Sequence, residues 1–252
     1  MIFPDKKIVY IKIPKTGSTS VYRYFADLDT YSTIINLNHL HGIRRDPRCF
    51  RRGKGWALGG HVSAQDIRWH LKDEYARYFK FTVVRNPYER LVSNYFWQRA
   101  KSRAPVSFKG FVKALIEDPS VLPKQCQLHA IPQMHWITDE AGELIVDQII
   151  RLENIDQELR STMRRLGLPE PVLGRSNETS HAHYSNYYDD ALRSGVQKLY
   201  QADIDFLGYQ FEDHRDPSFV DSPKEDTGSI ERGWWSRANR GMKKRVRDWL
   251  RE

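Results

Sequence analysis

The residues best suited to chemistry stand in two short segments, each directly behind an apolar run. The first segment gathers small hydroxylated residues around one lysine: Pro14, Lys15, Thr16, Gly17, Ser18, Thr19 and Ser20. A strand that runs into such a turn at a helix start presents backbone N–H groups and the positive end of the helix dipole. This pattern predicts an anion site, although a Ser/Thr-capped helix behind a lysine has the same pattern. It is not a Walker A loop, because Lys15 precedes the single glycine.

The second segment carries an arginine. Arg85 follows the apolar run 79–84, and Ser93 stands eight residues further on. In an open α/β sheet, ligands bind outside the carboxyl ends of the strands. Two strand ends, one with a lysine and hydroxyls and the other with an arginine and a serine, suit a ligand with two separate phosphates. A salt bridge and a capped helix are the alternative explanation of the second segment.

Together these segments resemble the phosphate-binding motifs of carbohydrate sulfotransferases, in the branch of the heparan sulfate 2-O and chondroitin 4-O enzymes. The resemblance continues at 59–61, 151–155 and 200–209, so it covers about residues 7–211. It implies a soluble, bacterial-type member with a P-loop-like parallel sheet flanked by helices. It also implies the donor 3′-phosphoadenosine 5′-phosphosulfate (PAPS), a hydroxyl acceptor on a saccharide or glycolipid, and no metal. The residues that would hold PAPS are Lys15, Thr16, Gly17, Ser18, Thr19, Ser20, Arg85 and Ser93.

Two side chains are expected to act in catalysis. Lys15 would stabilise the charge that develops on the leaving bridging oxygen. His61 is the expected general base, because it follows two glycines that permit close approach to a ligand and because imidazole titrates near neutral pH. A Gly-His step at this point also resembles the catalytic histidine of the 2-O enzymes. A helix-capping or core histidine is the alternative.

Four other histidines form two closely spaced pairs, His39 with His41 and His181 with His183. Each spacing places both rings on one side of a strand. Neither pair has a third ligand at motif spacing, so surface or acceptor-groove histidines are expected rather than zinc ligands. The basic stretch 44–54 is either a solvated loop or an access route for an anionic acceptor.

Strands and helices that alternate along the chain must position these residues, which is typical of an α/β protein with a largely parallel sheet. Strands are predicted at 7–13, 56–60, 79–84 and 146–152. Helices are predicted from residues 17–20 to about 28, and at 86–99, 157–166 and 189–206. We therefore expect a single catalytic domain over residues 1–212, followed by a linker and a basic C-terminal helix over 213–252.

Composition narrows the class of protein further. The 252 residues are 40% apolar and 29% charged, which is typical of globular proteins. Two cysteines exclude a disulfide framework and favour a reducing compartment. Because the sequence shows neither a long apolar run nor the pattern of a signal peptide, we expect a cytoplasmic protein.

The charge is concentrated at one end of the chain. Residues 232–252 hold eight basic and two acidic side chains, a balance of +6 within the total of +8. This segment could pack on the fold as a helix or make a peripheral membrane contact. One alternative function is therefore binding to a membrane surface or to nucleic acid through this segment. Charge that is concentrated in about twenty residues favours a peripheral contact over a folded surface that recognises nucleic acid. A kinase-like phosphoryl transferase is the other, disfavoured because a Walker A lysine and an acidic magnesium motif are missing.

Overall fold

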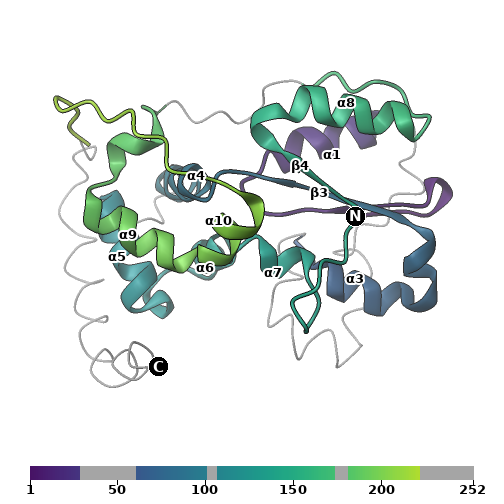
Figure 1. The fold of residues 1–252 in the computed structure, drawn as a ribbon, viewed down its shortest axis with the longest axis horizontal. Helices are drawn as coiled ribbons and strands as arrows, with labels where there is room; N and C mark the ends of the chain where they lie inside the picture. Colours follow the sequence, from purple (N-terminus) through teal and green to yellow (C-terminus); the bar gives the residue numbers. More distant parts are fainter. Residues whose placement is uncertain (29–60, 101–106, 174–180, 222–252) are drawn as a thin grey trace. The chain divides into compact units, whose positions relative to one another are not determined.

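A computed structural model describes residues 1–28, 61–100, 107–173 and 181–221 (Figure 1). The chain forms two compact units. The first unit contains Met1–Arg85 and Pro132–Glu178, and the second contains Asn86–Ile131 and Thr179–Glu252. The predicted boundary at residue 212 is not tested by this division and stays a prediction.

The first unit is built on a four-stranded sheet in the order β1-β2-β3-β4. Its strands are β1 Ile2–Phe3, β2 Ile8–Ile11, β3 Phe79–Val84 and β4 Gln148–Arg151. β2, β3 and β4 are parallel and β1 is antiparallel to β2. The predicted α/β class with a largely parallel sheet is therefore confirmed. The predicted strand 56–60 lies outside the described residues.

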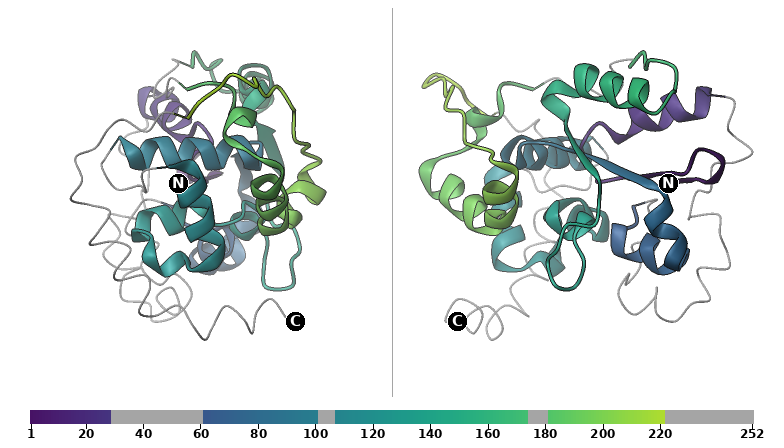
Figure 2. Two further views of the ribbon diagram at one scale, coloured as in Figure 1. Left: turned by 90° about the vertical axis from the view of Figure 1, so that its left-hand side faces the viewer. Right: turned by 45° about the vertical axis from the view of Figure 1, so that its right-hand side comes forward.

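Helices cover both faces of this sheet, with α1 Ser18–Asp27 and α8 Ile155–Arg165 on one face and α3 Ala64–Leu71 and α7 Met134–Ile137 on the other (Figures 1 and 2). Burial on both faces explains why β2 is a continuous apolar run. β3 is buried as well, although it carries Lys80 and Thr82 among its apolar residues. The core beneath α1 and α8 includes Phe3, Ile8, Tyr10, Val21, Phe25, Phe81, Val83, Ile150, Leu159 and Met163.

The second unit is helical. Its helices are α4 Pro87–Arg99, α5 Phe108–Glu117, α6 Lys124–Ala130, α9 Asp190–Leu199 and α10 Gln201–Leu207, with a short 3₁₀ helix, η7, at Tyr184–Tyr187. The start predicted for α4 is confirmed, since the side chain of Asn86 accepts a hydrogen bond from the Tyr88 amide and Pro87 opens the first turn. The apolar core of the second unit is rich in aromatic side chains, among them Tyr88, Tyr95, Phe108, Phe111, Tyr184, Tyr188 and Tyr200.

The single helix predicted over 189–206 is wrong, because the structure divides it into α9 and α10 at Tyr200. Tyr200 has a φ of −114° and a ψ of 25°, outside the helical region. Its side chain is buried, and its hydroxyl donates a 2.7 Å hydrogen bond to the carbonyl oxygen of Ala130. This buried anchor fixes the backbone at the break, while the apolar spacing on either side resembles that of one helix.

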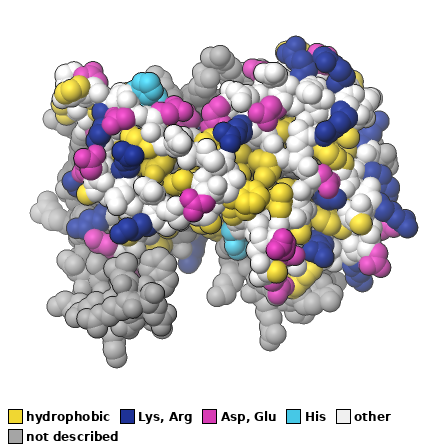
Figure 3. Space-filling model, in the orientation of Figure 1, with side chains coloured by type: hydrophobic (Ala, Val, Ile, Leu, Met, Phe, Trp, Pro, Cys, Tyr) yellow, Lys and Arg dark blue, Asp and Glu magenta, His cyan; other side chains and the backbone are white. Residues whose placement is uncertain are grey.

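Charges of both signs are interspersed on the face of the molecule shown in Figure 3. This agrees with the sequence, in which residues 1–231 carry only +2 of the total charge. Among the described residues, no helix combines the length and the apolar character needed to cross a membrane.

Candidate active site

The lysine-containing loop leaves the carboxyl end of β2 through a turn with two left-handed residues. Lys15 has a φ of 67° and Gly17 a φ of 70°, on either side of the buried Thr16. Thr16 holds the turn closed by donating from its hydroxyl to the carbonyl oxygen of Ile13 over 3.0 Å. A left-handed conformation costs about 1–2 kcal/mol at a residue with a side chain, and such strain clusters at functional sites. The turn thus brings the first residues of α1 directly behind the end of the strand.

Gly17 is required for space as well as for its backbone angle. A Cβ atom at this position would lie 2.6 Å from Cδ1 of Leu152. Leu152 is the first residue after β4 and opens the 3₁₀ helix Leu152–Asn154. The end of a third parallel strand therefore contacts the same loop, through a residue inside the stretch 151–155 that the sequence analysis singled out.

Arg85, the first residue after β3, meets this loop. Its guanidinium donates from one NH group to the carbonyl oxygen of Lys15 over 3.5 Å. β2 and β3 are neighbours in the sheet, which brings the ends of both strands together. The structure thus places the two predicted phosphate-binding cations, Lys15 and Arg85, at one edge of the sheet.

A residue that the sequence analysis missed, Gln133, fixes the backbone of Arg85. The amide N–H of Arg85 donates to Oε1 of Gln133 over 2.9 Å, and Nε2 of Gln133 donates to the carbonyl oxygen of Arg85 over 2.8 Å. Gln133 is fully buried in front of α7. A single glutamine 48 positions away from its partner gives no motif or periodicity, so the sequence carries no signal for this contact.

His61 lies at the same end of β2 and is 8% exposed. Its Nδ1 is 2.7 Å from the carbonyl oxygen of Lys12, which follows β2. Because a carbonyl can only accept, Nδ1 carries the proton in the neutral ring and the lone pair is on Nε2. The edge of the ring faces Trp136, with the centroids 6.1 Å apart.

The residue that caps the following helix is Ser63, whose hydroxyl accepts from the Asp66 amide while the Asp66 carboxylate accepts from the Ser63 amide. The helix-capping alternative for His61 is therefore wrong. The burial of His61 agrees with a core position, and its protonation pattern also suits a general base.

Lys12, the first residue after β2, is partly buried. Burial lowers the pKa of Lys12 below its ordinary value, and its ammonium lies 5.7 Å from the centre of the Tyr22 ring.

The remaining predicted site residues are placed as follows. Ser93 is a buried residue of α4 in the second unit, and its pairing with Arg85 stays a prediction. His39, His41 and the stretch 44–54 lie outside the described residues. The predicted same-side arrangement of His181 and His183 is wrong, because neither residue lies in a strand and the two rings have different neighbours. His181 stacks on Phe96, whereas His183 packs against His214.

Comparison with known proteins decides the family. Residues 1–210 match the Sulfotransferase family. The chain belongs to this family.

Two relatives of this sulfotransferase are informative. It is 24% identical over 259 residues to "Carbohydrate sulfotransferase 10" from Xenopus laevis, covering 85% of this chain and 66% of that protein. It thus spans slightly less than two thirds of that relative. It is also 29% identical over 109 residues to an uncharacterized protein of Archaeoglobus fulgidus, covering 42% of this chain and 82% of that protein. A search of the solved structures finds no match.

Proposed function

We propose that this sulfotransferase transfers the sulfuryl group of PAPS to a saccharide hydroxyl, with Lys15 and His61 as catalytic residues. The observation that carries the proposal is the contact between the guanidinium of Arg85 and the carbonyl oxygen of Lys15. It supports one ligand that offers two separate anionic groups to one edge of the sheet. PAPS has this form, with a phosphosulfate on the 5′ side and a phosphate on the 3′ side.

The loop at the end of β2 is suited to the 5′-phosphosulfate, in a P-loop-like manner. Its backbone N–H groups and the start of α1 favour an anion, and the hydroxyls of Thr16, Ser18, Thr19 and Ser20 are candidate donors. Arg85 can grip the 3′-phosphate with two parallel hydrogen bonds, with Ser93 as a further donor. This scheme for sulfuryl transfer requires no metal.

The reaction is an in-line displacement at sulfur. The acceptor oxygen forms a bond to the sulfur while the bond between the sulfur and the bridging oxygen breaks. Adenosine 3′,5′-bisphosphate leaves with the electron pair, and Lys15 stabilises its developing charge. Nε2 of His61 takes the proton of the acceptor hydroxyl. The Nδ1–H bond to the Lys12 carbonyl holds the required tautomer and stabilises the resulting imidazolium.

The acceptor class rests on the name of one relative, "Carbohydrate sulfotransferase 10". A panel of saccharides, glycolipids and small hydroxylated metabolites, incubated with PAPS labelled in its sulfate, tests it. Labelled saccharide is the expected product. Label on a non-saccharide acceptor alone would contradict the proposed acceptor class, and phosphate transfer from ATP would contradict the proposed chemistry.

Three variants assayed side by side test the assigned roles. Arg85→Ala should lose most of the thermal stabilisation by adenosine 3′,5′-bisphosphate, because the grip on the 3′-phosphate is gone. Lys15→Ala should reduce turnover far more than bisphosphate binding, because the leaving-group charge matures only in the transition state. His61→Gln keeps an N–H for the Lys12 carbonyl but removes the base. Its turnover should fall by about 10²–10⁴-fold with bisphosphate affinity close to that of the wild type.

Arg77→Ala is the matched control, since Arg77 is an exposed arginine of the same unit that pairs with Glu74. It should change neither turnover nor bisphosphate binding. Equal stabilisation of wild type and Arg85→Ala by the bisphosphate would remove Arg85 from the site. More than about a tenth of wild-type turnover in His61→Gln would exclude His61 as the base.

A further inference from the structure

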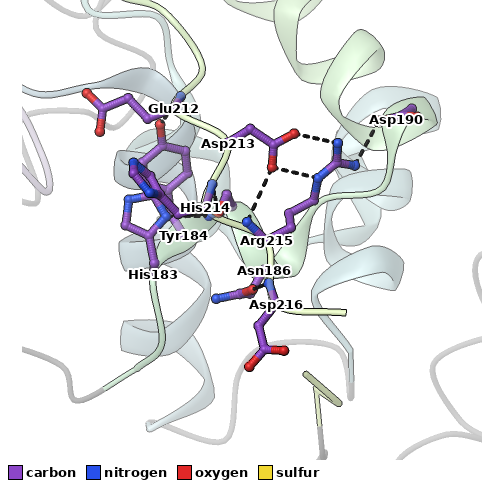
Figure 4. A network of polar contacts seen from close by, with 10 residues as sticks. His183, Tyr184, Asn186, Asp190, Glu212, Asp213, His214, Arg215 and Asp216 are labelled. Atoms are coloured by element: carbon purple, nitrogen blue, oxygen red, sulfur yellow. Dashed lines mark hydrogen bonds and ion pairs between the residues drawn. The ribbon is translucent and has the colours of Figure 1, made fainter. Parts of the chain in front are cut away.

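Three side chains of the second unit converge on one point at its surface (Figure 4). They are His183, directly before η7, and Glu212 and His214 in the segment that follows α10. One ligand atom of each residue lies within 4.8 Å of one ligand atom of each of the others. The two imidazole rings meet edge to face, with centroids 4.7 Å apart. His183 stands 29 positions before Glu212 in the sequence, so spacing did not reveal the group.

The backbone of the segment 212–216 is held against η7 by three regular hydrogen bonds. The amide of Glu212 donates to the hydroxyl of Tyr184 over 2.7 Å. The amide of His214 donates to the hydroxyl of Ser185 over 3.1 Å, and the amide of Asp216 donates to Oδ1 of Asn186 over 2.6 Å. Three consecutive side chains of η7 thus accept from every second residue of the segment. This register fixes where Glu212 and His214 leave the backbone.

A second pair of contacts anchors the same segment from its other side. Arg215 donates to the carboxylate of Asp213 over 2.6 Å and to Asp190 of α9 over 2.8 Å. Asp213 and Arg215 alternate along the segment with Glu212 and His214. Arg215 therefore pairs with the carboxylates of Asp213 and Asp190 and not with that of Glu212. The side chains of Glu212 and His214 therefore remain available to form one group with His183 (Figure 4).

The fully buried Ser185 links the two histidines. Its hydroxyl oxygen lies 2.9 Å from Nδ1 of His183 and also accepts from the backbone amide of His214. When Nε2 of a histidine binds a metal, Nδ1 carries the proton and donates to a neighbouring oxygen, which orients the ring. Ser185 stands where such an oxygen is needed. In the present arrangement the Ser185 amide donates to Nδ1 over 3.4 Å and His183 caps η7, so binding a metal through Nε2 would turn Nδ1 into a donor to the Ser185 hydroxyl and release this weak cap.

We propose that His183, Glu212 and His214 bind a divalent transition-metal ion, with zinc as the best match. Two imidazoles and one carboxylate are a common donor set for zinc, and a water molecule can complete the tetrahedron. Ligand atoms about 2.0–2.1 Å from a tetrahedral ion are roughly 3.3 Å apart, so the present arrangement needs only a modest closure. The ion would clamp the segment 212–216 onto η7. It has no part in the transfer reaction proposed above.

Burial and the nearby His214 lower the pKa of His183, with Glu212, Glu89 and His181 as further charged or titratable neighbours. The proposal itself stands on the convergence of the three ligands and on the position of Ser185.

The test uses the full chain without a histidine tag and Zn²⁺ as the probe. Zinc affinity is measured by competition with a chelating dye, and amide hydrogen exchange is followed with and without zinc. We expect zinc to slow exchange at the amides of His214 and Asp216, because the clamp holds these hydrogen bonds closed. His39 and His41 could also take up zinc, but only binding at the proposed site protects these two amides.

Four substitutions sharpen the test. Zinc affinity at the protected site should fall by at least about a hundredfold in His214→Ala and Glu212→Gln. It should fall by about 10–100-fold in Ser185→Ala, which removes the oxygen beside Nδ1 of His183 and the acceptor of the His214 amide but no metal ligand. His70→Ala, at an exposed histidine of the other unit, is the control and should change nothing. His214→Ala and Glu212→Gln alter exposed side chains, so both should fold. Unchanged exchange at His214 and Asp216 on adding zinc, or equal zinc affinity in wild type, His214→Ala and Glu212→Gln, would overturn the proposal.

Discussion

At the carboxyl end of β3, the side chain of Gln133 pairs with both backbone groups of Arg85, as a neighbouring strand would. The side-chain amide of Gln133 therefore supplies an acceptor to the backbone N–H of Arg85 and a donor to its carbonyl oxygen. It also holds the residue from which the guanidinium reaches the Lys15 loop. Gln133 is thus a positioning residue, one step removed from the proposed ligand.

Replacing Gln133 separates these two effects. Gln133→Ala leaves the partly buried amide of Arg85 without its acceptor, which should cost up to about 1–3 kcal/mol of unfolding free energy. Gln133→Glu retains an acceptor for the amide and loses the donor to the Arg85 carbonyl, so it should be less destabilising near neutral pH. Both variants should bind adenosine 3′,5′-bisphosphate more weakly than the wild type. Chemical denaturation and calorimetric titration measure the two quantities, and unchanged bisphosphate affinity in both variants would contradict the positioning role.

At the scale of elements, the site depends on how three parallel strands end. β2 ends in a turn with two left-handed residues, β3 ends at Arg85, and β4 continues into Leu152 against Gly17. Local sequence specifies each ending, through the glycine and the hydroxyl groups after β2 and through Asn86 and Pro87 after β3. The contact between Gly17 and Leu152 links two of these endings, and it makes the loop sensitive to a single methyl group.

Gly17→Ala should therefore be costly for two reasons. The left-handed backbone costs about 1–2 kcal/mol for alanine. The added methyl would also meet the end of the flexible Leu152 side chain, which must move aside at a smaller cost. Adding Leu152→Ala to this variant should relieve the clash, leaving the backbone cost and the cost of the lost Leu152 packing. Gly142→Ala is the matched control, because Gly142 has a φ of 83° and no atom of the described residues lies within 4 Å of the point where its Cβ would stand. Denaturant midpoints of the four proteins test this, and equal losses in Gly17→Ala and Gly142→Ala would contradict the steric part.

At the scale of the whole molecule, acid should weaken the fold. Partial burial lowers the pKa of the largely exposed His70 and His135 from an ordinary value of about 6.5, and for His135 the nearby Asp66 opposes the shift. Since the folded pKa lies below the unfolded one, the unfolded chain binds protons first as the pH falls. The free energy of unfolding should therefore decrease as pH falls through about 6.5. Hydrogen bonds to Asp189 and Glu170, which lower their pKa values, should extend the loss to more acidic pH.

Urea midpoints measured between about pH 7.5 and 5.5 test the histidine contribution. The double variant His70→Gln, His135→Gln should reduce the dependence over this window, and His183, whose pKa is also lowered, accounts for part of what is left. If the double variant and the wild type lose stability in parallel, the responsible groups are elsewhere.

The charge distribution of the whole chain leads to a separate prediction about residues 232–252, which carry +6 of the total +8. If this segment makes a peripheral membrane contact, deleting residues 230–252 should abolish salt-sensitive sedimentation with anionic liposomes, because each basic residue contributes about 1 kcal/mol near such a surface. Activity on a small, freely diffusing acceptor should be retained. An insoluble or fully inactive truncated protein would show instead that the segment belongs to the fold.

The sequence by itself determined the α/β class, three parallel strands and the strand-to-helix turns that carry Lys15 and Arg85. It could do so because these features are local: an apolar run predicts a buried strand, and a cap residue or glycine marks the next helix start. For this reason the boundaries of β3 agree with the prediction to the residue, and α4 begins one residue after the predicted start at 86 and ends at Arg99.

Only the tertiary structure decided which distant residues complete these turns. Gln133 reaches Arg85, Leu152 packs on Gly17, and Tyr200 breaks a helix by bonding to Ala130. His183 likewise meets His214 rather than its sequence neighbour His181. Each of these contacts joins positions separated by tens of residues. Their pairing is set by the packing of whole elements and leaves no periodic or motif signal in the chain.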